Sequence, residues 1–237
     1  MELSNSSVGA AVVPQAKGTF ERIIGIFVSP AETMRDIVAR PTWLLPLLII
    51  AVVSCASGIF LKDAIVQQQI EAMQKKNMSD EQIQQALPMM EKIMTFTVPI
   101  FGLIMPPIIY LILAGIGMFV GNVILGGEAK YSTLFAVTCW SGIVSVLSSL
   151  INVPVMASRQ SMESATSLGS FLATEENKTF LHHLLAQIDL FSIWWVALLG
   201  FGVAAAYKFS TKKAMTMVFV VWAIFALGAA FLKSMFS

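Results

Sequence analysis

The sequence predicts an all-α, polytopic membrane protein with five transmembrane helices. Of the 237 residues, 57% are hydrophobic and only 12% are charged, about half the roughly 25% of an ordinary soluble domain. The charged residues also leave long uncharged runs, several of which reach the roughly 20 residues that a helix needs to cross a bilayer. The net charge of +1 gives no basic footprint, so nucleic acid is not expected as a partner.

Residues 1–40 are expected to form a cytoplasmic tail followed by interfacial amphipathic helices. Ser29 can cap the free amides of a helix, and Glu32 can reach back to complete a capping box. Pro30 suits the first position of that helix, because its missing N–H is not needed there. The helix should end at Arg40, because the residue before Pro41 avoids helical geometry.

The apolar residues of this region favour a position on the membrane surface. Met34, Ile37 and Val38 recur on one face of the second helix, and Phe20, Ile23, Ile24 and Phe27 form a similar stripe upstream. Such helices lie in the interface between lipid and water. The alternative is a docking surface for a cytoplasmic partner, and the two roles can coexist. The candidate residues for it are Ser29, Pro30, Glu32, Arg35 and Arg40.

Residues 41–237 are expected to form the membrane domain. The second uncharged run is too long for one straight span and too short for two, so we expect one span, tilted or kinked at Pro106 and Pro107. The five predicted spans are about 42–61, 98–125, 132–157, 189–207 and 214–232.

The link 62–96 is expected to form a helical hairpin outside the membrane. It is rich in helix formers and is interrupted by "KKNMSDEQ". Ser79 should begin the second arm, with Gln82 at the capping-box position, and Pro88 should bend that arm.

The distribution of cations favours a cytoplasmic N-terminus. The short link "YKFSTKK" has three cations and no acid, whereas the link 62–92 has four cations and five acids. Cytoplasmic loops carry the excess of Lys and Arg. The hairpin would then lie on the opposite side of the membrane.

The predicted spans have no charged residue at their centres, although transporters of ions usually need one there. Gly117 and Gly121 form a small-xxx-small pair, and Asn122 can hydrogen-bond between helices. We interpret these residues as helix-packing positions, with a substrate path as the alternative. The sequence has no nucleophile–base pair, phosphate loop, zinc motif or haem motif, so we expect no catalytic residue, cofactor or metal.

Two segments resemble bacterial Yip1-domain proteins: "FERIIGIFVSPAETMRDIVARPTWLLPLLI" and "VGNVILGGEAKYSTLFAVTCWSGIVSVL". The resemblance extends from about Phe20 to the C-terminus. It implies five spans, a cytoplasmic N-terminal region and a place in the bacterial cytoplasmic (inner) membrane. Eukaryotic members act in membrane traffic with small GTPases, and some bacterial members accompany ABC-type exporters. The resemblance assigns no role to the hairpin.

Together these features predict a non-enzymatic accessory or scaffold protein of the membrane. Its partners would be the lipid bilayer and a larger membrane complex, such as an ABC-type exporter, or a second copy of itself. The alternative function is a small-molecule or ion transporter or channel.

Overall fold

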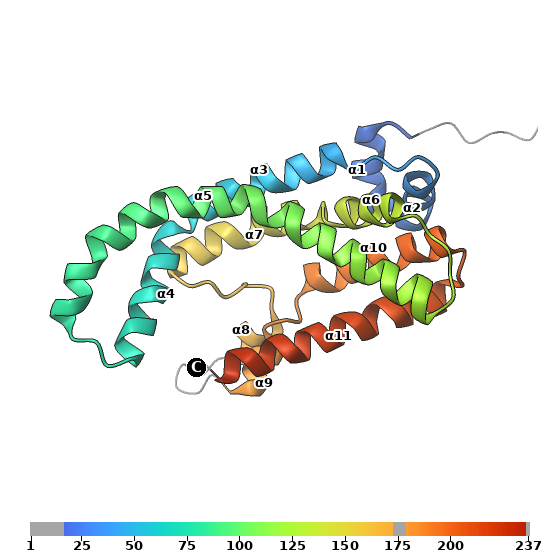
Figure 1. The fold of residues 1–237 in the computed structure, drawn as a ribbon. Coiled ribbons are helices and arrows are strands. Elements are labelled where there is room, and N and C mark those ends of the chain that lie inside the picture. Colours follow the sequence, from blue (N-terminus) through green and yellow to red (C-terminus); the bar gives the residue numbers. More distant parts are fainter. Residues whose placement is uncertain (1–16, 173–178, 236–237) are drawn as a thin grey trace, which may run out of the picture.

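The computed structural model describes residues 17–172 and 179–235, and the described residues form helices without a β-strand (Figure 1). An isolated antiparallel bridge joins Ser167 to Asp189. The helices are α1 (Thr19–Val28), α2 (Pro30–Ala39), α3 (Leu44–Phe60), α4 (Lys62–Lys75), α5 (Asp80–Met118), the π-helix η1 (Phe119–Ile124), α6 (Tyr131–Ser141), α7 (Val144–Arg159), α8 (Leu168–Leu172), α9 (Phe180–Leu185), α10 (Leu190–Tyr207) and α11 (Thr211–Met235).

Four stretches of the described chain are long and apolar enough to cross a membrane, and a fifth is added if α2 and α3 count as one broken span. The angle between α2 and α3 is 120°. In Figure 1, α3, α5, the pair α6–α7, α10 and α11 run back and forth along one direction. The two ends of the described chain therefore lie at opposite ends of the bundle. The predicted all-α, polytopic class is confirmed.

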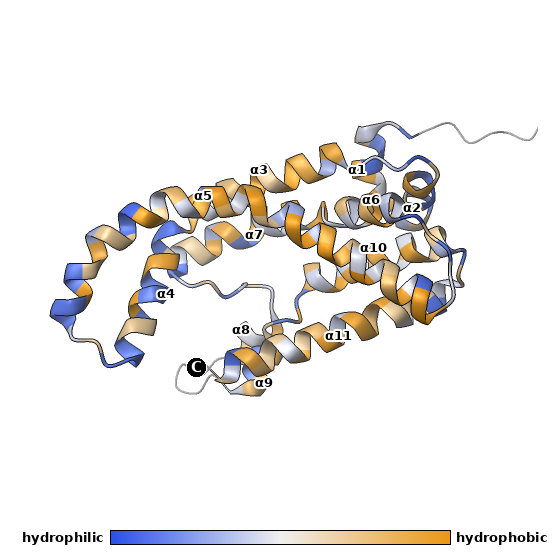
Figure 2. Ribbon diagram, in the orientation of Figure 1, coloured by the Kyte–Doolittle hydropathy of each residue, from blue (hydrophilic) through white to orange (hydrophobic). Residues whose placement is uncertain are grey.

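The second arm of the hairpin and the second span form one continuous helix, Asp80–Ile124, of 45 residues. At a rise of roughly 1.5 Å per residue such a helix is on the order of 65 Å long, about twice the hydrocarbon thickness of a bilayer. Figure 2 shows that α4 and the start of α5 mix hydrophilic and hydrophobic residues, whereas the rest of α5 is mostly apolar. The hairpin is thus a rigid extension of a span.

The start of α5 has the predicted capping box. The Ser79 hydroxyl accepts a hydrogen bond from the Gln82 amide at 3.3 Å, and the Gln82 side chain accepts one from the Ser79 amide at 3.0 Å. Four prolines, among them Pro88 and Pro99, lie inside α5, which forms an arch (Figure 1). Each removes one helix hydrogen bond, and curvature of this kind is the usual result.

The third span is interrupted, which the sequence analysis does not predict. Its first half, α6, ends at Ser141, and α7 begins at Val144. Gly142 lies at the break, where the Tyr110 ring of α5 occupies the space that a side chain would need. Only a residue without a side chain therefore fits beside Tyr110 at this break.

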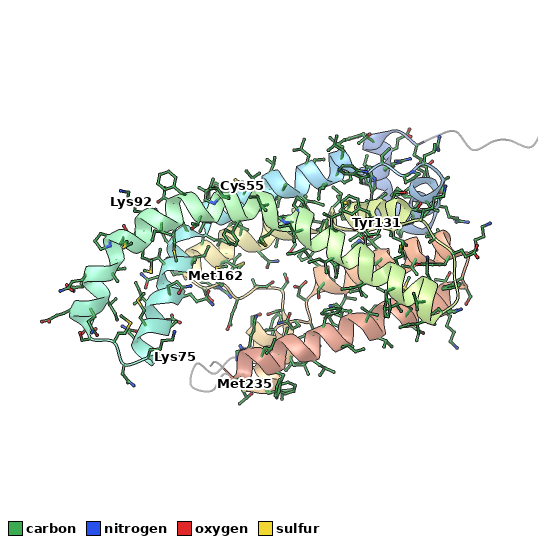
Figure 3. All side chains as sticks on the ribbon, in the orientation of Figure 1. Cys55, Lys75, Lys92, Tyr131, Met162 and Met235 are labelled. Carbon is green, nitrogen blue, oxygen red and sulfur yellow. The ribbon has the colours of Figure 1, made fainter. Side chains whose placement is uncertain are left out.

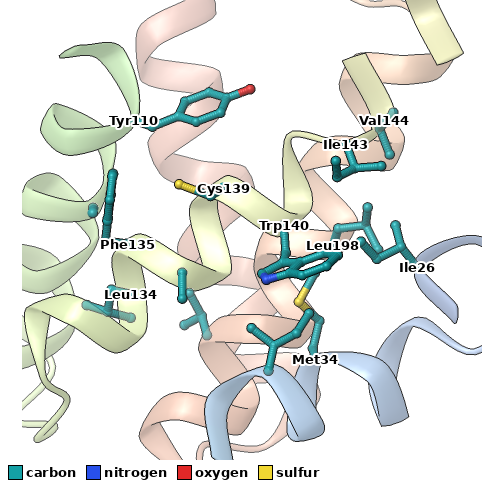
Figure 4. Close-up of a cluster of buried hydrophobic side chains, with 14 of the residues drawn as sticks. Ile26, Met34, Tyr110, Leu134, Phe135, Cys139, Trp140, Ile143, Val144 and Leu198 are labelled. Carbon is teal, nitrogen blue, oxygen red and sulfur yellow. The ribbon is translucent and has the colours of Figure 1, made fainter. Parts of the chain in front are cut away.

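The buried core joins the N-terminal helices to the bundle. Ile26 of α1 and Met34 of α2 lie near Trp140 of α6 and Leu198 of α10 (Figure 4), and each of these side chains is at most 1% exposed. On the other side, α3 and α5 approach closely at Gly102, where an added Cβ would lie 2.6 Å from the Cα atom of Cys55.

Candidate functional site: the N-terminal helix pair

A buried arginine joins α1, α2 and the start of the first span. Arg22 is only 5% exposed, and its Nε donates to the Asp36 carboxylate at 2.7 Å. Its two terminal nitrogens donate to the Thr42 hydroxyl at 2.8 Å and to the Arg40 carbonyl at 3.3 Å. One guanidinium group therefore connects α1 to the C-terminal end of α2 and to the turn that leads into α3.

The same network continues into the membrane bundle through Trp140. The Arg22 guanidinium carbon lies 5.7 Å from the centroid of the Trp140 ring, and the Trp140 indole donates to the Thr42 carbonyl at 2.6 Å. A cation over an aromatic face is attracted by the ring, more strongly when water is excluded. These contacts attach the helix pair to α6.

Asp36 is the acidic centre of the network. It forms ion pairs with Arg22 and with Arg40, and its carboxylate also accepts from the Lys17 amide at 3.4 Å. Burial alone would raise the pKa of Asp36, but hydrogen bonds from Arg22 and Arg40 outweigh it and lower the pKa below its ordinary value. The carboxylate therefore stays charged at neutral pH.

The predicted cap of α2 by the Ser29 side chain is wrong. Ser29 occupies the N-cap position, but its hydroxyl makes no capping hydrogen bond and instead accepts from the Lys17 ammonium at 3.4 Å. Glu32 does not complete a capping box with Ser29; its carboxylate pairs with Lys17 at 3.2 Å. Pro30 lies in the first turn as predicted, and α2 ends at Ala39 with Arg40 as the capping residue.

The exposed sides of the two helices differ in chemistry. On α1, Phe20, Ile24 and Val28 recur every fourth residue and are 73%, 48% and 78% exposed. On α2 the exposed side chains include Glu32 and Arg35, and the Arg35 guanidinium donates to the Ala31 carbonyl of its own helix at 3.2 Å. We call the exposed residues Glu32, Arg35 and Arg40 the outer face of α2. The exposed apolar side chains of α1 are suited to contact with lipid. The outer face of α2 is suited to contact with water or with a polar partner.

The predicted packing pair has two unlike members, Gly117 in α5 and Gly121 in η1. The Tyr207 ring of α10 occupies the space that a side chain on Gly121 would need. No heavy atom lies within 4 Å of the corresponding position on Gly117, whose carbonyl accepts from the Tyr207 hydroxyl at 3.3 Å. The close approach is therefore between Gly121 and an aromatic side chain, not between two helix backbones.

Asn122 holds the link between the second and third spans. It lies in η1, and its side-chain amide donates to the Ala129 carbonyl at 3.2 Å while its oxygen accepts from the Ala129 amide at 3.3 Å. This pair of bonds lies within one connection rather than between helices. Pro106 and Pro107 are inside α5, buried and half-buried respectively, and they do not line the apolar cavity between α5 and α11.

Local sequence patterns do not predict the burial of Arg22, nor the packing roles of Gly102 and Tyr110. A signal for the first was present, since a short connection between two helices brings residue 22 within reach of residue 36. Among the described residues, no group of three His, Cys, Asp or Glu side chains could hold a metal ion.

Comparison with known proteins places most of the chain in one family. Residues 24–232 match the family model described as the Yip1 domain. Searches of curated proteins and of solved structures gave no match.

Proposed function

Because the chain belongs to the Yip1 domain family, a family of membrane proteins, we propose that it is a non-enzymatic accessory or scaffold protein that binds a larger membrane complex through the outer face of α2. The observation that carries the proposal is the buried Arg22 network. Removing charges from water is costly, so a buried ion pair adds little stability by itself. We infer that this network serves to hold the helices in one arrangement. Here that arrangement is the position of α2 against the bundle.

The proposed docking surface combines rigidity with exposure. Thr33, Met34 and Ile37 of α2 are fully buried, so the helix cannot rotate to expose another face. The Glu32 and Arg35 side chains are exposed on the outside, although Glu32 pairs with Lys17 and Arg35 bonds to the Ala31 carbonyl. Preorganised charges of both signs favour a partner with complementary charges and limit the choice of partner.

We also propose that this end of the bundle faces the cytoplasm. Among the described residues, the end that carries α1, α2 and the α10–α11 turn has eight cations and four acids, whereas the hairpin end has six cations and seven acids. The positive-inside rule assigns the first end to the cytoplasm. Figure 3 shows how far apart the two ends lie: Tyr131 is near the first end and Lys75 is at the tip of the hairpin.

The bacterial inner membrane as the location, and an ABC-type exporter as the partner, are proposals that rest on the family resemblance.

Co-purification tests the proposed surface. The variant Arg35→Glu reverses a charge of the outer face, and the wild-type Arg35 side chain bonds only to the Ala31 carbonyl of its own helix, outside the contacts of Arg22, Asp36 and Lys17. Lys75→Glu is the matched control on the exposed hairpin tip. We expect the wild-type chain and the hairpin variant to isolate with a membrane complex in mild detergent, and the α2 variant to isolate without it. A chain that isolates alone in all three forms, or only with a second copy of itself, would contradict the proposal.

A further inference from the structure

An apolar cavity of about 120 Å³ is lined by residues of α5, α6, α10 and α11. Its lining includes Gly117, Trp195, Met217, Trp222 and Phe225. The one hydroxyl group in the lining is that of Thr138, which donates to the Leu134 carbonyl of its own helix at 2.9 Å. Apolar cavities of this size in proteins exclude water and accept hydrocarbon ligands.

We propose that this cavity binds an acyl chain of an anionic membrane lipid whose headgroup lies at Lys213. Lipid is the solvent around these helices, and its hydrocarbon matches a lining made mostly of aliphatic and aromatic side chains, in which the Thr138 hydroxyl is bonded to its own backbone. The proposal concerns a site apart from the outer face of α2, so it does not depend on the proposed partner.

The first turn of α11 supports the position of the headgroup. Lys213 precedes the cavity-lining Met217 by four residues, and residues four apart on a helix lie on the same face one turn apart. Lys213 is exposed and lies at the end of the bundle that carries the excess of cations. A lipid chain in the cavity would therefore extend towards an ammonium group at the membrane surface.

A chain of aromatic contacts joins Lys213 to the wall of the cavity. The Lys213 ammonium lies 3.8 Å from the centroid of the Phe209 ring, which stacks on Tyr207 with centroids 5.1 Å apart. The Tyr207 hydroxyl donates at 3.3 Å to the carbonyl of Gly117, a lining residue. These contacts connect the lysine, through two aromatic side chains, to the backbone of a residue that lines the cavity.

The test uses quenching of tryptophan fluorescence by phosphatidylglycerol with dibrominated acyl chains, and phosphatidylcholine with the same chains for comparison. The full-length protein would carry Trp43→Phe and Trp194→Phe, so that Trp195 and Trp222 report on the cavity beside the buried Trp140. Gly117→Leu fills the cavity. Gly115→Leu is the matched control, because it lies on the same helix, has equally open space around it and does not line the cavity.

We expect saturable quenching by phosphatidylglycerol that Gly117→Leu removes and Gly115→Leu preserves, with unchanged helix content in both variants. Lys213→Gln should weaken binding of phosphatidylglycerol about fivefold and leave phosphatidylcholine unaffected, as for the loss of one surface cation. Equal quenching of the two leucine variants, or equal affinity for the two lipids, would overturn the proposal. Neither result would alter co-purification of a partner through α2.

Discussion

The two ends of the bundle are built in different ways. At the N-terminal end, a buried ion pair joins α1 to α2, and an indole hydrogen bond from Trp140 to Thr42 joins residues 98 apart in the sequence. At the opposite end, α4 and the start of α5 project as a hairpin, and most of their side chains are exposed. The first end owes its shape to contacts over long sequence separations, and the second mainly to local helix formation.

This difference predicts how far the effect of a substitution should extend from each end. Substitutions in the buried network should affect the whole bundle, because they leave a charge without its partner. Substitutions in the hairpin should act locally, because regions with few buried contacts open independently of the rest.

The largest effect is expected from removal of one member of the buried pair. Asp36→Ala leaves the Arg22 guanidinium buried without its carboxylate, which should lower the free energy of unfolding by about 3–5 kcal/mol. Glu32→Ala removes the other acid that pairs in this region, but its side chain is 66% exposed, so the loss should stay below about 1 kcal/mol. Denaturant unfolding in mild detergent would measure both. Similar losses for the two variants would show that the Arg22 network does not distinguish this end.

Acid should weaken the same network. The folded-state pKa of Asp36 lies below its ordinary value of 3.8, so the stability it contributes is fully present above that value and is lost as the pH falls through the lower, folded-state pKa. Unfolding midpoints measured across acidic pH should therefore decline, and Asp36→Asn should flatten the part of the decline that this carboxylate causes. If Asp36→Asn has the same pH profile as the wild-type protein, ionisation of Asp36 does not contribute to the stability of the fold.

A smaller effect separates Gly117 of α5 from Gly121 of η1. Gly121→Ala would collide with the Tyr207 ring, so it should cost about 1–3 kcal/mol, as overpacking does. Gly117→Ala has open space and should stabilise the helix by up to about 1 kcal/mol. The measurement is again the free energy of unfolding in detergent. If both variants are stabilised, or both destabilised, the contact between Gly121 and Tyr207 is contradicted.

The smallest effect is expected in the hairpin. Ser79→Ala removes the cap at the start of α5, which should cost about 1 kcal/mol. Hydrogen exchange should accelerate in the first turns of α5 and stay unchanged in α1 and α2. Faster exchange in α1 and α2 would show that the two ends are coupled.

The sequence predicts the parts of the fold that depend on composition and local spacing. Long uncharged runs identify the spans, and Ser79 with Gln82 identifies the start of α5, because both patterns act through the residues beside them. The Ser29 cap fails although its local pattern is similar. A lysine twelve residues earlier contacts the hydroxyl, and no local pattern contains that competition.

The features that position the candidate site depend on distant residues. The burial of Arg22 requires Asp36, Thr42 and Trp140 to meet, and the break at Gly142 requires Tyr110 from another span. The outer residues Glu32 and Arg35 are predictable as polar positions on a helix. Their fixed orientation is not, because it results from what α2 buries on its other side.

Labelling of single thiols tests most directly the claim that the two ends face opposite compartments. Cys55 and Cys139 would be replaced by alanine, and Arg35→Cys, Lys212→Cys and Lys75→Cys would be made one at a time at exposed positions. A membrane-impermeant maleimide added to intact cells should label the variant at position 75, and should label those at positions 35 and 212 only after the membrane is opened. Labelling of positions 35 and 75 from the same side would contradict the account.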